Sequence, residues 1–274
     1  MKESKTEFDN SNKKTIIVTP SGRRKYLHIL LNFLKKQKKD FDEWHLWNNC
    51  RDKEDEIYIY ELEKEYEWIS VINRNLDDNI RGNNTAIHRF FDYTTSPNTV
   101  YIRLDDDIVY LEDNFVKNLV EFRLENPNYF LVYANIINNN IINHIHYRML
   151  DLDMAPINYD CMGNLWNSMD RCKQLHQIFQ KDLKSNDINK WKFSKWVLYD
   201  YERVSINAIS WIGGSFENFG EIVGWDEEQW LSCTYPSQIK TRNVICGNAI
   251  CVHGAFYTQR NDELEKIIQH YSDL

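Results

Sequence analysis

The sequence has no run of the ~18 apolar residues that a helix needs to cross a bilayer. Its first 14 residues are polar and charged, without the apolar stretch of a secretory signal. We therefore expect residues 1–14 to form a flexible lead-in and the protein to have no membrane span. We expect it in the cytoplasm, or in the host cytoplasm if the source is viral.

Zinc-type cysteine pairs and an excess of positive charge are also missing. None of the six cysteines forms a C-x-x-C pair, so their spacing indicates no zinc site. Lys and Arg number 33 against 41 Asp and Glu, which gives a formal net charge of −8. A chain of this charge without a long cationic face is a poor partner for nucleic acid.

Proline and glycine are few, with 5 and 9 residues, and no Pro/Gly/Ser-rich linker interrupts the chain. Hydrophobic residues make up 42% and aromatic residues 14%, which excludes a disordered chain or a coiled coil and provides for a sizeable core. We therefore expect a single domain over residues 15–274.

Short β-branched runs alternate with amphipathic segments in the first half of the chain. Strands are expected at TIIV (from Thr15), at FDEWHLWNN, at WISVIN and at VYIRL; helices at RRKYLHILLNFLKKQKK, over residues 52–67 and over GNNTAIHRFFDYTT. Further on, we expect a helix in NFVKNLVEFRLENP, a strand in YFLVYANII, a surface loop in the Asn-rich segment that follows, a helix start at Asp226, a strand in NVICGNAICVHGAFY and a short helix in DELEKIIQHY. This alternation predicts an α/β fold with a mainly parallel central sheet flanked by helices.

Three consecutive carboxylates, Asp105, Asp106 and Asp107, follow the apolar strand VYIRL. Adjacent carboxylates repel one another, so a fold that holds them together needs a cation or many hydrogen bonds. Mg²⁺ and Mn²⁺ take one or two carboxylates and complete their coordination with substrate phosphates. The structural alternative is a solvated acidic turn that caps the next helix.

With its neighbours, this segment resembles the DxD motif of GT-A-type nucleotide-sugar glycosyltransferases. IIVTPSGRRKYL resembles the opening strand and nucleotide-binding loop of that family, EWHLWNN its second strand, GWDEEQWLS the acidic helix start that supplies a base, and NVICGNAICVHGAFYTQR the closing segment with a metal-ligating His. The resemblance covers roughly residues 15–260. It implies a Rossmann-like GT-A fold with a nucleotide-binding half at about 15–110 and an acceptor half at about 111–274.

The resemblance also implies a metal site and a nucleotide-sugar site. Asp107 and His253 would ligate Mn²⁺ or Mg²⁺, and Asp105 would contact metal or ribose, while the register of Asp106 stays open because three acids are consecutive. The implied donor contacts are Thr19, Pro20, Ser21, Arg23, Asn48, Asn49, Arg81, Arg103, Asp105 and Asp106. A helix cap at Ser21 and a satisfied core histidine at His253 are the structural alternatives.

In inverting members of the family, a carboxylate at the second acidic segment deprotonates the acceptor hydroxyl. Asp226, Glu227 and Glu228 are the candidates here, with Asp226 preferred and the register open. Asp226 followed by Gln229 also fits a capping box, a purely structural role. Trp211 and Trp225 flank this region in the sequence and are expected to stack on a sugar of the donor or acceptor; burial in the core, which is commoner for tryptophan, is the structural alternative.

The sequence therefore predicts a metal-dependent glycosyltransferase that moves a sugar, preferably from a UDP-sugar, to a glycan, glycoprotein or small-molecule acceptor with inversion. A retaining transferase of the same fold, a metal-dependent phosphohydrolase, and a carbohydrate- or nucleotide-binding protein without catalysis are the alternatives.

Overall fold

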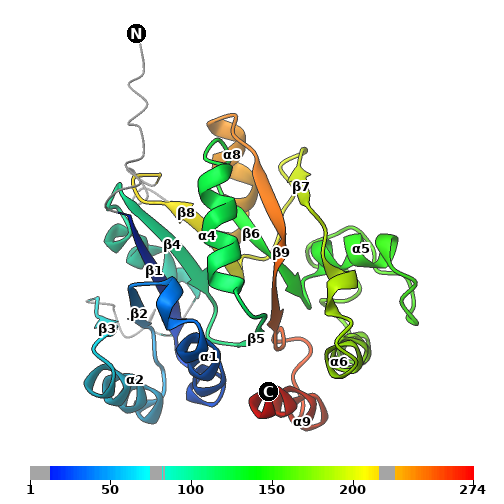
Figure 1. The fold of residues 1–274 in the computed structure, drawn as a ribbon, viewed down its shortest axis with the longest axis horizontal. Helices are drawn as coiled ribbons and strands as arrows, with labels where there is room; N and C mark the ends of the chain where they lie inside the picture. The colour runs from blue at the N-terminus through cyan, green and yellow to red at the C-terminus, as the bar shows by residue number, and fades with distance from the viewer. Residues whose placement is uncertain (1–12, 75–81, 83, 216–225) are drawn as a thin grey trace.

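One mixed sheet of nine strands runs through the molecule (Figure 1). The computed structural model describes residues 13–74, 82, 84–215 and 226–274. The spatial order is β3-β2-β1-β4-β8-β6-β9-β5, and β7 also pairs with β9. The strands are β1 (Lys14–Ser21), β2 (Glu43–Asn48), β3 (Ile69–Ile72), β4 (Thr99–Leu104), β5 (Ile108–Leu111), β6 (Val132–Ile137), β7 (Lys195–Leu198), β8 (Ala208–Ile212) and β9 (Asn243–His253).

Most strands of the sheet share one direction. β1 is parallel to β2 and β4, β2 to β3, and β6 to β9. β8 is antiparallel to its neighbours β4 and β6, so β6 and β9 point the same way as β1 to β4, whereas β5 and β7 oppose β9. The predicted α/β fold with a mainly parallel sheet is confirmed, and the carboxyl ends of β1, β2, β3, β4, β6 and β9 meet at one edge, which we call the carboxyl edge.

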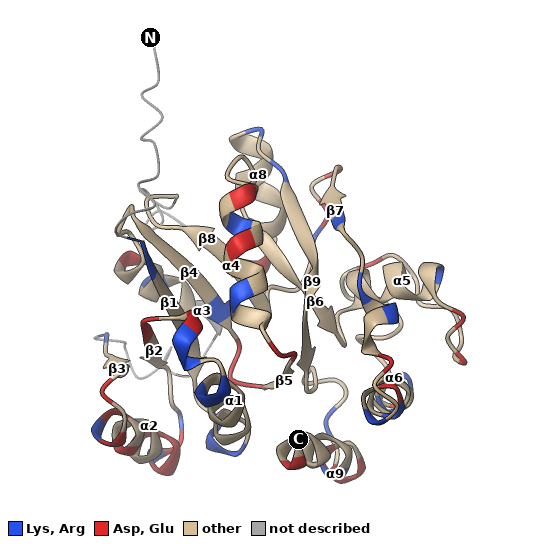
Figure 2. Ribbon diagram, viewed as in Figure 1, with Lys and Arg blue, Asp and Glu red and all other residues tan. Residues whose placement is uncertain are grey.

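Helices flank the sheet, and α4 lies across one face over β9, β8 and β6 (Figure 1). The helices are α1 (Arg24–Lys36), α2 (Lys53–Glu65), α3 (Asn84–Ile87), α4 (Phe115–Glu125), α5 (Asn140–Met149), α6 (Met169–Lys184), α7 (Glu227–Gln229), α8 (Tyr235–Gln238) and α9 (Asp262–Gln269). Figure 2 shows that charged residues gather on the helices and the connecting segments, while the strands carry few of them. Within the described ranges, no helix is long and apolar enough to cross a membrane.

Most elements of the first half lie where the sequence predicts them. In α1, the apolar residues at helical spacing, such as Leu27, Leu30 and Leu34, are fully buried, and lysines occupy the last turn. The segment expected as one helix before β4 is shorter than predicted, with α3 followed by a 3-10 turn over His88–Tyr93. Lys14 belongs to β1, whereas residues 1–12 of the predicted lead-in lie outside the described residues.

The prediction of an Asn-rich surface loop after β6 is wrong. The segment forms α5, capped by Asn139, whose side chain accepts the Ile142 amide. Asn138, Asn139, Asn140 and Asn143 are buried, with at most 1% of each exposed. Their amides find hydrogen-bond partners inside the fold, so the polar composition reflects a buried network instead of a solvated surface.

Candidate functional site

Segments that are far apart in the sequence come together at the carboxyl edge. The loop after β1 brings Gly22 and Arg23, the end of β4 brings the DDD triplet (Asp105, Asp106 and Asp107), and the last residue of β9 is His253. β1, β4 and β9 share one direction, so their carboxyl ends lie on the same side of the sheet. The sequence predicted this meeting of loop, carboxylates and histidine.

Arg23 is the cation that compensates two carboxylates of the DDD triplet. Its Nη1 lies 2.6 Å from Asp107 Oδ2, its Nε donates to Asp106 Oδ1 at 2.9 Å, and its Nη2 also contacts Asp106. The backbone amide of Gly22 donates to Asp106 Oδ2 at 2.9 Å. A side chain predicted to reach phosphate is therefore held on the aspartates in this arrangement.

The two aspartates have opposite pKa shifts. Burial raises the pKa of Asp106 to about 6, against the pull of Arg23. Burial acts in the same direction on Asp107, but the neighbouring Arg23, His253 and Arg260 outweigh it and hold the pKa of Asp107 below its ordinary value. Asp107 is therefore ionised at neutral pH.

His253 faces Asp107 in the geometry of a second metal ligand. Its Nε2 lies 3.3 Å from Asp107 Oδ2, and its Nδ1 lies 3.3 Å from the carbonyl oxygen of Asn138, the residue after β6. The Asn138 carbonyl can only accept a hydrogen bond, so an Nδ1–H donated to it fixes the ring with Nε2 toward Asp107. The Gly254 amide donates to the Asp107 carbonyl at 2.8 Å, and a Cβ at this position would lie only 3.2 Å from that oxygen, so glycine suits the close approach.

Arg103 joins the DDD triplet to the DEE triplet (Asp226, Glu227 and Glu228). Its Nη1 donates to Glu227 Oε1 at 2.6 Å, and its Nε donates to Asp105 Oδ1 at 3.0 Å. Burial raises the pKa of Glu227 to about 7 despite this ion pair. Contact between Arg103 and the donor stays a prediction, which this arrangement does not favour, because only 4% of the Arg103 side chain is exposed and Asp105 and Glu227 both bind it.

Arg203, which the sequence did not single out, holds the other two acids of the DEE triplet. Its Nη2 lies 2.8 Å from Asp226 Oδ2, and its Nε donates to Glu228 Oε1 at 2.9 Å. Asp226 Oδ1 also accepts the amide of Gln229 at 2.9 Å, so the predicted helix cap is confirmed. Three arginines, Arg23, Arg103 and Arg203, thus bridge all six acids of the two triplets in pairs.

The predicted nucleotide-reading side chains mostly have internal partners. Thr19 Oγ1 accepts the Trp44 indole N–H at 2.9 Å, and Ser21 Oγ donates to the Thr19 carbonyl at 3.0 Å. Asn48 donates to Glu56 and Asn73, and Asn49 accepts the amide of Gly82 at 2.7 Å. Pro20 is buried in β1. Contact between these side chains and a nucleotide stays a prediction, which these internal bonds do not favour.

The predicted stacking of Trp211 on a sugar is wrong. The ring is fully buried, stacked on Tyr101 with centroids 5.8 Å apart and packed against Phe91. Its place in β8 points it into the core between sheet and helices instead of at the carboxyl edge. Trp225 and Arg81 lie outside the described residues.

The residues at Asp107 fit a divalent cation with two protein ligands. Asp107 Oδ1 is buried and has no hydrogen-bond partner among the described residues, which is a costly state for a carboxylate oxygen. With His253 Nε2 it offers two ligands, and Mg²⁺-type sites take the rest from water and phosphate. No group of three or more His, Cys, Asp or Glu side chains in the described part of the chain is arranged to hold a metal ion.

Asp105, the third predicted metal ligand, already has hydrogen-bond partners at both carboxylate oxygens. Its oxygens accept Arg103 Nε and, at 3.2 Å, the Asn207 side-chain N–H. The backbone carbonyl of Asn207 in turn accepts the Asp105 backbone amide at 2.8 Å. A role for Asp105 as a metal ligand would cost these bonds. Asp107 and His253 are therefore the better pair.

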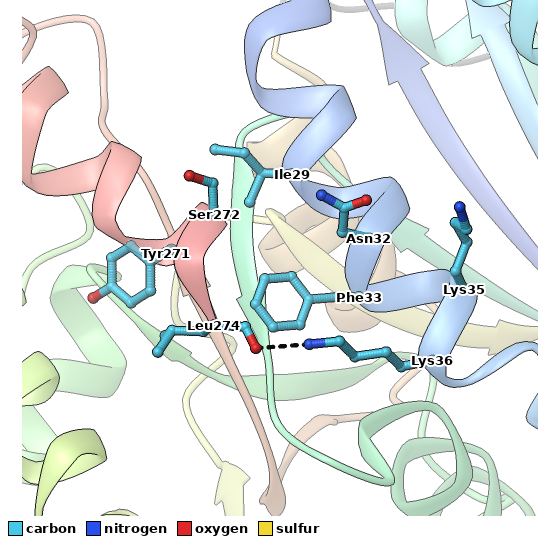
Figure 3. A pocket seen from close by; sticks show the side chains of 8 residues that line it. All are labelled: Ile29, Asn32, Phe33, Lys35, Lys36, Tyr271, Ser272 and Leu274. Atoms are coloured by element: carbon cyan, nitrogen blue, oxygen red, sulfur yellow. Dashed lines mark hydrogen bonds between the residues drawn. The ribbon is translucent and has the colours of Figure 1, made fainter.

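Neither of two hollows on the described surface is lined by the DDD triplet. One of about 450 Å³ lies between α1 and the C-terminal turn, where Lys36 Nζ donates to the Leu274 carbonyl at 2.7 Å (Figure 3). The other, of about 340 Å³, is lined in part by Cys161 and Arg203, which both contact Glu228. Of these two, the second adjoins the candidate chemistry through Glu228.

No described protein family and no curated protein matches this sequence. Among solved structures, 4-diphosphocytidyl-2C-methyl-D-erythritol synthase from Anaerococcus prevotii DSM 20548 is 11% identical with a TM-score of 0.46, covering 94% of this chain and 96% of its own. CMP:2-keto-3-deoxy-manno-octonic acid synthetase in complex with CTP is 8% identical with a TM-score of 0.48, covering 96% and 99%. Similarity at this level decides neither the family nor the activity of this chain.

Proposed function

We propose that this chain is a glycosyltransferase that depends on Mn²⁺ or Mg²⁺. It moves a sugar from a nucleotide-sugar donor, preferably a UDP-sugar, to a hydroxyl group of a glycan, glycoprotein or small-molecule acceptor with inversion. The observation that carries the proposal is the pairing of Asp107 with His253 beside the loop after β1, with one Asp107 oxygen buried and unpaired.

Charge supports a cation at this place. Asp105, Asp106, Asp107 and Glu227 are all buried or nearly so, against two guanidinium groups among them, Arg23 and Arg103. Arg260 approaches Asp107 from the rim at 3.6 Å, with 45% of its side chain exposed. A bound divalent cation would offset this excess of carboxylates and, as a Lewis acid, stabilise the departing diphosphate.

The chain's own residues have distinct tasks in this proposal. Asp107 and His253 hold the cation, and Asn138 orients His253. Arg23 lies on the carboxylates, so a diphosphate that binds beside them meets a preformed guanidinium, which suits bidentate contact with phosphate oxygens.

The base belongs to the DEE triplet, and the contacts favour Glu228. Asp226 spends one oxygen on the helix cap and the other on Arg203, and Glu227 is buried behind Arg103. Glu228 is 22% exposed at its side chain and stands beside the hollow that contains Cys161. A carboxylate within hydrogen-bond reach of the acceptor hydroxyl accepts its proton as the anomeric carbon loses the nucleoside diphosphate.

Thermal unfolding in the presence of nucleotide sugars tests the proposal. Native protein and Asp107→Asn are heated with a panel of nucleotide sugars in Mn²⁺, in Mg²⁺ and in EDTA. A donor at one hundred times its Kd stabilises the native state by about 2.7 kcal/mol. We expect a metal-dependent rise in Tm with one class of nucleotide, absent in Asp107→Asn.

The variant without ligand is the control for folding, because Asp107 is buried. If Asp107→Asn fails to fold, His253→Gln replaces it in the same panel. No shift with any nucleotide sugar under any metal condition contradicts the proposal. Steady release of phosphate from simple esters without an acceptor would identify a phosphohydrolase instead.

A further inference from the structure

The hollow of about 340 Å³ beside the DEE triplet has no role in holding the donor as described above. It lies between α5, the loop over residues 157–166 and the segment before β8, and Ile141, Tyr159, Asp160, Cys161, Met162, Glu202 and Arg203 line it. We call it the Tyr159 hollow.

A buried asparagine fixes the wall of the Tyr159 hollow. Asn140 is 1% exposed, and its Nδ2 donates to the carbonyls of Asn158 at 2.7 Å and Asp160 at 2.6 Å. Its Oδ1 accepts the amides of Leu165 at 2.9 Å and Trp166 at 3.3 Å. One side chain in α5 thus ties the loop at both ends, so the wall is ordered before any ligand arrives, which lowers the cost of binding.

The lining combines exposed apolar surface with acidic hydrogen-bond acceptors. Tyr159 is 43% exposed and Met162 45% exposed, although large apolar side chains are mostly buried elsewhere. Glu202 accepts the Tyr159 hydroxyl at 3.0 Å, and Asp160 also lines the hollow. An aromatic face beside carboxylates matches the apolar face and the hydroxyl groups of a sugar ring.

The charges of the lining residues indicate which class of ligand the Tyr159 hollow binds. Arg203 is the one basic side chain in the lining, and its guanidinium already holds Asp226 and Glu228. Glu202 and Asp160 then leave the hollow negative, which disfavours phosphates and other anionic ligands. The lining is therefore suited to a neutral polyhydroxylated molecule.

Two lining residues connect the hollow to the chemistry. Cys161 Sγ, at 3.3 Å, and Arg203 Nε, at 2.9 Å, both contact Glu228 Oε1. Glu228 follows Glu227, which Arg103 links to Asp105 of the DDD triplet. A hydroxyl that replaces Cys161 or Arg203 on Glu228 would meet a carboxylate next to the proposed donor site.

We propose that the Tyr159 hollow binds the acceptor as a neutral sugar, with the ring against Tyr159 and one hydroxyl directed to Glu228. That the bound sugar is the acceptor rests on the proposed function. Binding of a neutral sugar in the hollow is testable by itself.

Saturation-transfer difference NMR with methyl glycosides of glucose, galactose and mannose tests the inference, each alone and with UDP and the diamagnetic Mg²⁺. The proteins are native, Tyr159→Ala and the control Tyr199→Ala, which removes another exposed tyrosine, 62% exposed and outside the hollow. We expect a signal for at least one glycoside that falls about threefold or more in Tyr159→Ala and persists in Tyr199→Ala.

The UDP resonances in the same samples report the donor site and the folding of each variant. A UDP signal without any glycoside signal, or equal glycoside signals in Tyr159→Ala and Tyr199→Ala, overturns the inference while the donor site stands. A Tyr159-dependent glycoside signal without a UDP signal supports a sugar site here and contradicts the proposed donor.

Discussion

Two arginines perform the same task in opposite surroundings. Arg103 bridges Asp105 and Glu227 with 4% of its side chain exposed, and Arg203 bridges Asp226 and Glu228 with 31% exposed. The first joins the DDD triplet to the DEE triplet, and the second joins two residues within the DEE triplet.

The difference in burial separates a structural bridge from one that can open. Desolvation raises the pKa of Glu227 to about 7, so keeping this carboxylate charged beside Arg103 costs free energy. Removal of Arg103 would leave the buried carboxylates of Asp105 and Glu227 without their cation. Water and salt screen the Arg203 bridge. Arg103 therefore fixes the spacing of the triplets, whereas Arg203 can yield Glu228 to a ligand.

Removal of Arg103 has the largest expected effect. Arg103→Gln leaves Asp105 and Glu227 without their cation and is expected to lower the free energy of unfolding by about 3–5 kcal/mol. Arg203→Gln is the matched control, with an expected loss below about 1 kcal/mol because its ion pairs are solvated. Urea unfolding at pH 7 measures both. Equal losses would erase the distinction between the two bridges.

The burial of Glu227 beside Arg103 makes the stability of the protein depend on pH. Its pKa is about 7 in the folded protein against an ordinary 4.5, so the fold favours the protonated form. The stability that protonated Glu227 contributes is complete below pH 4.5 and disappears as pH rises through 7. Native protein should therefore lose about 2 kcal/mol relative to Glu227→Gln between pH 5 and 8. Urea unfolding of both proteins from pH 5 to 8 measures this difference in the free energy of unfolding. Parallel plots of that free energy against pH would contradict the raised pKa of Glu227.

Removal of Arg23 has the smallest expected effect, and it acts on the affinity for the cation. Its guanidinium lies on Asp107 Oδ2 and so competes with a divalent cation for that carboxylate. We expect Arg23→Gln to bind Mn²⁺ about tenfold more tightly, a change of about 1.4 kcal/mol, by isothermal titration calorimetry. Arg24→Gln, whose ion pair with Glu54 is exposed, should leave the affinity unchanged. Weaker binding in Arg23→Gln would mean that Arg23 supports the cation site.

Periodicity predicted much of the first half of the fold because its elements bury simple apolar patterns. The helix over residues 169–184 was not predicted, since two of its buried positions are His176 and Asp182, which interrupt the apolar stripe. The strand over residues 208–212 was not predicted either, because it leads directly into Gly213 and Gly214.

The candidate site was predictable as a set of segments but not as a set of contacts. Strand order brings Asp107 and His253 together, as the motifs implied. The pairing of six acids by three arginines depends on the register of β4 against β8 and on the position of α7, which no local pattern encodes. Trp211 followed the commoner fate of tryptophan and lies in the core.

The central claim is that Asp107 and His253 hold a divalent cation together with a nucleotide diphosphate. Electron paramagnetic resonance of free Mn²⁺, titrated with native protein, Asp107→Asn and His253→Gln in the presence and absence of UDP, tests it most directly. The account predicts that native protein with UDP depletes the free Mn²⁺ signal and that both variants restore it. Equal depletion by all three proteins would contradict the account.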